Sequence, residues 1–122
     1  MPQATLTIPS SVEHVRTARL VAVAAARRAG LDEATVDDVR LAVGEVVARA
    51  VLRHTAASSS AEVDMVVRDD GDGFEIEVCG DVAADAPDPD DDDYALALVR
   101  ALAPELTWTP GCTVVRWPLA PR

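Results

Sequence analysis

The segment Leu41–His54 (LAVGEVVARAVLRH) constrains the fold most, because it reads as a long apolar helix with only two charges in its middle. Its valines and leucines, Leu41 and Leu52 among them, predict a helix that is buried over most of its surface. The two charges, Glu45 and Arg49, lie four residues apart and therefore point to the same side of the helix. Charged side chains on a buried helix are costly unless they pair or line a cavity. Two interpretations remain open: an internal Glu45–Arg49 ion pair, or a helix face that looks into a present or former ligand pocket.

Length and composition predict one domain with a core of its own. The chain has 122 residues, of which 49% are hydrophobic and only 3% aromatic, so we expect a core of alanine, valine and leucine. No apolar run reaches the length of a membrane span and no secretory signal is visible, which favours a cytoplasmic protein. The formal net charge of −10 argues against nucleic acids and anionic membranes as partners. A basic or mixed protein surface is the better expectation.

The cysteines and histidines show no metal-ligand spacing. Cys79 and Cys112 lack a C-x-x-C or Cys/His pattern, so we expect buried strand thiols in a reducing compartment rather than a metal site or a disulfide framework. The histidines, His14 and His54, likewise predict no zinc site. His54 ends the apolar helix, where a cation interacts favourably with the helix dipole.

Hydrophobic periodicity predicts the order β-α-α-β-β-loop-α-β-β, with helices on one face of a mostly antiparallel sheet. This is an α+β two-layer sandwich with about three helices. A serine (Ser10 or Ser11) is expected to cap the first helix, Gly30 to end it, and Asp32 to cap the second. The expected strands are Thr5–Ile8, Glu62–Arg68, Phe74–Cys79, Leu106–Thr109 and Thr113–Trp117, and the expected helices end near Ala29, His54 and Leu102.

Two segments between these elements have strong composition signals. Asp69–Gly73 supplies turn chemistry between two strand patterns and predicts a hairpin. Asp81–Asp93, here called the acidic segment, contains seven aspartates and two prolines. Such a composition predicts a solvated loop without helix or strand.

The apolar helix LAVGEVVARAVLRH resembles the first nucleotide-binding box of the histidine-kinase-like ATPases, also called the GHKL or Bergerat-fold superfamily. The likeness looks closest to the small anti-sigma-factor serine kinases of bacteria. The opening TLTIPSSVEHVRTAR, the helix YALALVRAL and the closing TWTPGCTVVRWPL resemble the corresponding parts of that group in the same order. The resemblance therefore implies a single GHKL-like domain over residues 1–122, with the acidic segment in place of the ATP lid.

In the first box, the family has a helix glutamate followed four residues later by an asparagine that holds the magnesium of bound ATP. Glu45 matches the glutamate, but Arg49 stands at the asparagine position. An arginine offers only hydrogen-bond donors and a fixed positive charge, so it cannot coordinate a cation. The resemblance therefore implies a lost magnesium site.

The second box of the family is an aspartate-x-glycine-x-glycine run whose aspartate reads the adenine amino group. A literal match at Asp69–Gly73 falls in the expected hairpin, whereas the family's box follows the next strand. There the aspartate position falls on Gly80, and the glycines become Val82 and Ala84. Asp81 substitutes for the aspartate only if the end of the strand shifts by one residue.

The third feature of the family is a glycine-rich lid that ends at a helix whose N-terminus cradles the phosphates. At that place this chain has Asp90, Asp91, Asp92 and Asp93, with Ala95 just inside the helix and no glycine. Glycine is needed there for close backbone approach, and four carboxylates repel ATP. One hypothesis is that Arg49 and these aspartates neutralise each other across the former pocket. The alternative is a solvated tether, with Arg49 paired only to Glu45.

Together these departures predict a non-catalytic regulatory domain, a pseudokinase of the anti-sigma type that binds a protein and needs neither ATP nor magnesium. The resemblance implies a sigma factor or a STAS-type anti-anti-sigma protein as partner, and a homodimer is also plausible. The alternative is an active ATP- and magnesium-dependent serine kinase, in which Glu45 acts as the base and Asp81 reads adenine. Five arginines are expected on exposed helix faces, where some can meet an acidic partner: Arg16, Arg19, Arg27, Arg28 and Arg40.

Overall fold

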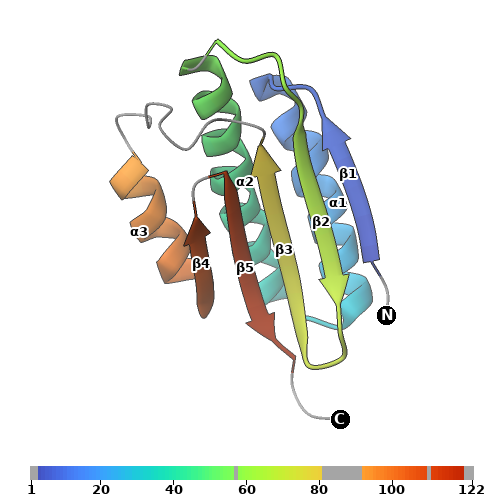
Figure 1. Ribbon diagram of the computed structural model, residues 1–122. Helices are drawn as coiled ribbons and strands as arrows, with labels where there is room; N and C mark the ends of the chain where they lie inside the picture. Colours follow the sequence, from blue (N-terminus) through green and yellow to red (C-terminus); the bar gives the residue numbers. More distant parts are fainter. Residues whose placement is uncertain (1–2, 57, 81–91, 110, 120–122) are drawn as a thin grey trace.

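The computed structural model describes residues 3–56, 58–80, 92–109 and 111–119. In these ranges three α-helices pack on one face of a five-stranded antiparallel sheet with the order β1-β2-β3-β5-β4 (Figure 1). The predicted fold class and element order are confirmed. No helix in the described part of the chain is both long and apolar enough to span a membrane. The elements are β1 (Gln3–Ile8), η1 (Val12–His14), α1 (Val15–Ala29), α2 (Glu33–Ala56), β2 (Val63–Asp69), β3 (Gly73–Gly80), α3 (Asp92–Leu102), β4 (Glu105–Thr109) and β5 (Cys112–Pro118).

The turn between α1 and α2 forms as its residues predict. Gly30 takes the left-handed conformation at φ 92° and ends α1. Asp32 caps α2, because its Oδ1 accepts a hydrogen bond of 2.8 Å from the backbone N–H of Thr35. This bond also lowers the pKa of Asp32. Ser11 occupies the N-cap position of η1, through which the chain enters α1, but it makes no side-chain cap bond, so the predicted serine cap is found in position only.

At the centre of the core, a valine stripe on α2 packs against the inward face of the sheet. The stripe follows the three- and four-residue spacing of a helix, and all its members are fully or almost fully buried. Most of Leu41–His54 is buried or half-buried, as expected, but the two leucines are exceptions: Leu41 and Leu52 are 55% and 40% exposed. They lie on the side of α2 that faces away from the sheet. The stripe and its main sheet partners are Val36, Val39, Val43, Val47, Val51, Met65, Phe74, Ile76 and Val115.

The acidic segment was expected to contain no helix, but its last two residues, Asp92 and Asp93, form the first turn of α3. Negative charges at a helix N-terminus offset the helix dipole, which explains why helix begins within the aspartate run. The rest of the segment, residues 81–91, lies outside the described residues.

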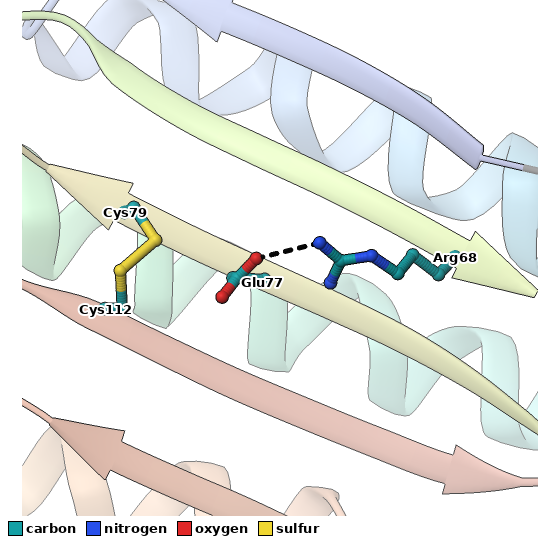
Figure 2. Close-up of a disulfide and its surroundings, with 4 residues drawn as sticks. All are labelled: Arg68, Glu77, Cys79 and Cys112. Atoms are coloured by element: carbon teal, nitrogen blue, oxygen red, sulfur yellow. Dashed lines mark hydrogen bonds and ion pairs between the residues drawn. A yellow bond between two sulfur atoms is a disulfide. The ribbon is translucent and has the colours of Figure 1, made fainter.

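A disulfide joins Cys79 in β3 to Cys112 in β5 (Figure 2), so the prediction of buried, unbonded thiols is wrong. The two residues lie directly opposite each other in the antiparallel ladder, with their Cα atoms 4.2 Å apart. Just beyond them the N–H of Gly80 donates to the carbonyl of Gly111, which makes the cysteines a non-hydrogen-bonded pair with closely spaced side chains. Both are half-buried on the sheet face that carries no helices.

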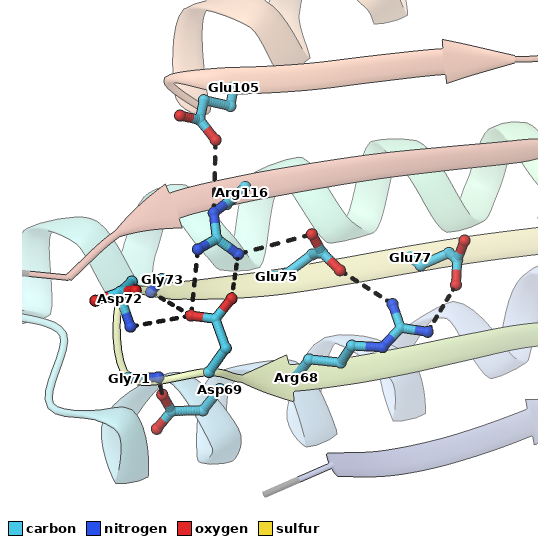
Figure 3. Close-up of polar contacts among 10 residues, drawn as sticks. Arg68, Asp69, Gly71, Asp72, Gly73, Glu75, Glu77, Glu105 and Arg116 are labelled. Carbon is cyan, nitrogen blue, oxygen red and sulfur yellow. Dashed lines mark hydrogen bonds and ion pairs between the residues drawn. The ribbon is translucent and has the colours of Figure 1, made fainter. Parts of the chain in front are cut away.

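The hairpin between β2 and β3 confirms the turn prediction for Asp69–Gly73. Gly71 has a φ of 86°, and its N–H donates to Oδ1 of Asp69. The N–H of Gly73 donates to Oδ1 of Asp70 at 2.7 Å (Figure 3). The aspartate-x-glycine-x-glycine match is therefore turn chemistry that joins two strands.

An ion-pair network fastens this turn to the uncovered face of the sheet (Figure 3). Arg116 on β5 contacts Asp70 at 2.9 Å, Glu75 at 3.7 Å and Glu105 at 3.6 Å. The hydrogen bond from Arg116, aided by the backbone N–H of Gly73, lowers the pKa of Asp70 to about 2. The turn is thus tied to the neighbouring strand through one carboxylate.

Acid unfolding should report this carboxylate. The folded pKa of Asp70 lies below its ordinary value of 3.8. The contribution of this ionised carboxylate to the free energy of unfolding is therefore complete above about pH 4, and it disappears as the pH falls towards 2. We expect Asp70→Asn to flatten the pH dependence of the free energy of unfolding in this window, measured by urea titration. The control Asp72→Asn, at an exposed residue of the same turn, should keep the wild-type slope. An unchanged slope in Asp70→Asn would contradict the assignment.

Candidate functional site

A small cavity lies where the C-terminal half of α2 meets the adjoining ends of β3 and β5. Its volume is about 20 Å³, and its lining includes Arg49, Arg53, His54, Gly80 and Thr113. A volume of this order holds about one water molecule, whereas pockets for drug-sized ligands measure roughly 300–1,000 Å³. The site is therefore filled almost completely by the protein's own side chains.

Two buried arginines supply the charge of the site. Arg49 and Arg53 are one helical turn apart on α2 and are 9% and 6% exposed. Neither is without a partner. None of the ion pairs between described residues joins Arg49 to Glu45, which lies half-buried one turn earlier. Of the two interpretations of this helix face, the arrangement favours the one in which Arg49 lines a cavity.

His54 is completely buried and holds three segments together. Its Nδ1 contacts both the carbonyl of Ala61, at 2.8 Å, and Oγ of Ser10. Because that carbonyl can only accept, the bond of 2.8 Å requires the tautomer with a proton on Nδ1. No described residue hydrogen-bonds to Nε2. The prediction of His54 as a simple helix-terminal cation missed this buried position.

Gly80, at the end of β3, lies against His54. A Cβ atom added to Gly80 would come within 3.0 Å of Nε2, closer than real Cβ contacts. A side chain at residue 80 therefore requires His54 to move. The sequence identified Gly80 as a site position, but it did not identify His54 or Arg53; the only available signal was their location one turn beyond Arg49.

The other predicted positions are only partly placed by the structure. Ala95 is buried on α3, and the backbone of Asp92 and Asp93 lies in the first turn of that helix. Pairing between Arg49 and the acidic segment stays a prediction. The predicted positions outside the described residues are Asp81, Val82, Ala84, Asp90 and Asp91.

The contact between Gly80 and His54 predicts coupled stability effects. Gly80→Ala should lower the free energy of unfolding by about 1–3 kcal/mol, the usual cost of overpacking a tight site. In a His54→Ala background the same substitution should cost much less, because the opposing ring is gone. Urea unfolding of the four proteins measures this double-mutant cycle.

Gly44→Ala is the matched control for this cycle. Its Cβ would lie 3.1 Å from the flexible side chain of Arg19, and alanine favours the helix over glycine. It should be neutral or stabilising. Equal costs of Gly80→Ala in both backgrounds would show that His54 does not determine the residue at this position.

Comparison with known proteins agrees with the fold. Residues 8–117 match the family described as the histidine kinase-like ATPase domain. The fold is similar to a crystal structure of the RsbU and RsbW domains of Rv1364c from Mycobacterium tuberculosis, with a TM-score of 0.69 and 20% sequence identity. That alignment covers 97% of this chain and 31% of the other, so this chain corresponds to less than two thirds of that protein. A search of curated protein sequences gives no match.

Proposed function

This chain belongs to the histidine kinase-like ATPase domain family, and from that premise we propose that it is a non-catalytic, anti-sigma-type regulator that acts by binding a protein. The observation that carries the proposal is the filled site. Where the family resemblance places nucleotide and metal, this chain has two buried arginines, a buried histidine and a cavity of about 20 Å³. The proposal therefore includes the loss of ATP and magnesium binding.

The loss of magnesium follows from the chemistry of Arg49. The resemblance puts this residue at the metal-holding asparagine, and its guanidinium has donors but no acceptor for a cation. Arg53, one turn further, adds a second positive charge to the same buried face. A divalent cation placed between them would gain no ligand from either guanidinium.

The loss of adenine recognition follows from Gly80 and His54. Gly80 has no carboxylate to accept a hydrogen bond from an adenine amino group. The imidazole of His54 also occupies the space that a side chain at residue 80 would need. A planar base also needs far more room than a cavity that holds one water. Both effects act against nucleotide binding at the same end of β3.

Protein binding is supported by the surface of α1. This helix carries four arginines and no acidic residue, in a chain with a net charge of −10. Arg27 pairs with Glu33 at 2.9 Å, whereas Arg16, Arg19 and Arg28 form no ion pair with any described residue. Arg16 and Arg19, three residues apart on one exposed side of α1, thus offer positive charge to an acidic patch on a sigma factor or a STAS-type protein.

A second candidate function is an ATP-dependent serine kinase. The observation in its favour is Glu45, which is retained at the family's glutamate position and lies half-buried on the same side of α2 as Arg49. In this alternative Glu45 is the base beside the γ-phosphate and Asp81 reads adenine. It requires another way to hold magnesium, so it ranks second.

Isothermal titration calorimetry separates the two candidates. We expect no saturable heat when ATP, with or without magnesium, is added to the protein, because the side chains that fill the site cannot leave it without cost. A related domain with intact nucleotide-binding boxes serves as the positive control. Saturable binding of magnesium–ATP in the micromolar range would overturn the proposal in favour of the kinase.

Partner association should depend on the acidic segment. Neutralising Asp90–Asp93 to asparagine should slow association with the co-purified sigma factor or STAS protein roughly tenfold at low salt, and flatten its salt dependence. Stopped-flow kinetics measures both effects. The matched control neutralises four other acids, Asp37, Asp38, Glu62 and Asp64, and so has the same net charge. Equal rates in the two variants would remove the acidic segment from the mechanism.

A further inference from the structure

We propose that Glu77, Cys79 and Cys112 form a redox-controlled binding site for a thiophilic divalent cation such as zinc. The site is closed while the cysteines form the disulfide and opens when a dithiol reduces it. It lies on the uncovered face of the sheet, on side chains that point away from the helices (Figure 2). The inference goes beyond the proposed function and does not depend on it.

The ladder of β3 and β5 brings the three donors together. Cys79 and Cys112 are directly opposite, and Glu77 lies two residues before Cys79 on the same face of β3. One ligand atom from each residue lies within 4.8 Å of the others. All three residues are half-buried, so an ion and a reductant can reach them. Because the donors are on paired strands and not on loops, the site is held in place by the ladder itself.

The chemistry of the donor set selects the ion. Two thiolates favour soft or borderline cations such as Zn²⁺ or Co²⁺ over Mg²⁺ and Ca²⁺. Three protein ligands leave the fourth tetrahedral position to water or to a group from another molecule.

Arg68 stands beside the site and fixes the carboxylate. Its guanidinium contacts Oε1 of Glu77 at 3.1 Å and also Glu75 at 3.0 Å. A bond of this kind orients a ligating carboxylate while its second oxygen remains available. The divalent ion offsets the charge of the two thiolates, and Arg68, which is shared between Glu77 and Glu75, offsets part of the carboxylate charge.

The redox step is a thiol–disulfide exchange. A dithiol attacks the Cys79–Cys112 bond; its own two sulfurs become a disulfide, and two electrons and two protons pass to the cysteines. Binding of the ion then releases the two thiol protons as thiolate–metal bonds form. Reoxidation by a disulfide reverses the exchange and expels the ion.

Cobalt titration tests the proposal. The protein is reduced with a phosphine, which does not compete as a thiol ligand, and Co²⁺ is added while thiolate-to-cobalt charge-transfer absorption is recorded. The reduced wild type should bind one ion per chain and the oxidised protein none. As a readout that needs no variant, Zn²⁺ should raise the Tm of the reduced protein but not that of the oxidised one.

Matched variants identify the ligands. Cys79→Ser and Cys112→Ser should abolish the absorption, and Glu77→Gln should weaken binding roughly tenfold or more. Asp64→Asn is the control, because Asp64 lies opposite Cys79 on β2 but accepts a hydrogen bond from Thr7. It should change affinity by less than about threefold. The proposal is overturned by a reduced wild type that binds no ion, or by Glu77→Gln that binds as tightly as wild type.

Discussion

The packing of the α2 valine stripe on the sheet is the interaction on which the rest of the structure depends. It fixes the rotation of the helix, so every other side chain on α2 has its direction decided as well. Leu41 and Leu52 are turned outward, while Arg49 and Arg53 are turned towards the ends of β3 and β5. Buried guanidinium groups are expensive to keep, and they are retained only where surrounding groups stabilise their charge. The directions of Arg49 and Arg53 therefore follow from the packing of the valine stripe on the sheet.

His54 shows how one buried polar group constrains residues that are far apart in the sequence. Its Nδ1 ties the end of α2 to Ser10, after β1, and to Ala61, before β2. These bonds hold the ring against Gly80 at the end of β3. The ring can make room for a larger residue only at a cost in stability, because moving it weakens the hydrogen bonds of its buried Nδ1. The position of the His54 ring thus accounts both for glycine at residue 80 and for the absence of a carboxylate there.

The sequence alone predicted the element order, the hairpin at Asp69–Gly73 and the cap at Asp32, because periodicity and turn chemistry are local properties. It also named Gly80 and Arg49, which both line the cavity, but their match to positions of the family pattern stays a prediction. It could not find the role of His54, whose partners become neighbours only in the folded chain. It predicted the wrong state for the cysteines, because strand register, and not spacing along the chain, places Cys79 opposite Cys112. Pairing between Arg49 and the acidic segment stays a prediction.

The disulfide also adds stability to a core that is built mainly from small side chains. Only 3% of the residues are aromatic, and the core is built mainly from alanine and valine, which bury less surface per residue than larger side chains. Cys79 and Cys112 are 33 residues apart, and closing a loop of that length stabilises the fold by about 3–4 kcal/mol in the chain-entropy account. That is a large share of the total for a typical domain, about 5–15 kcal/mol. Because β3 alternates between the core and the open face, this stabilisation comes from the exposed side of the strand, where redox conditions can reach it.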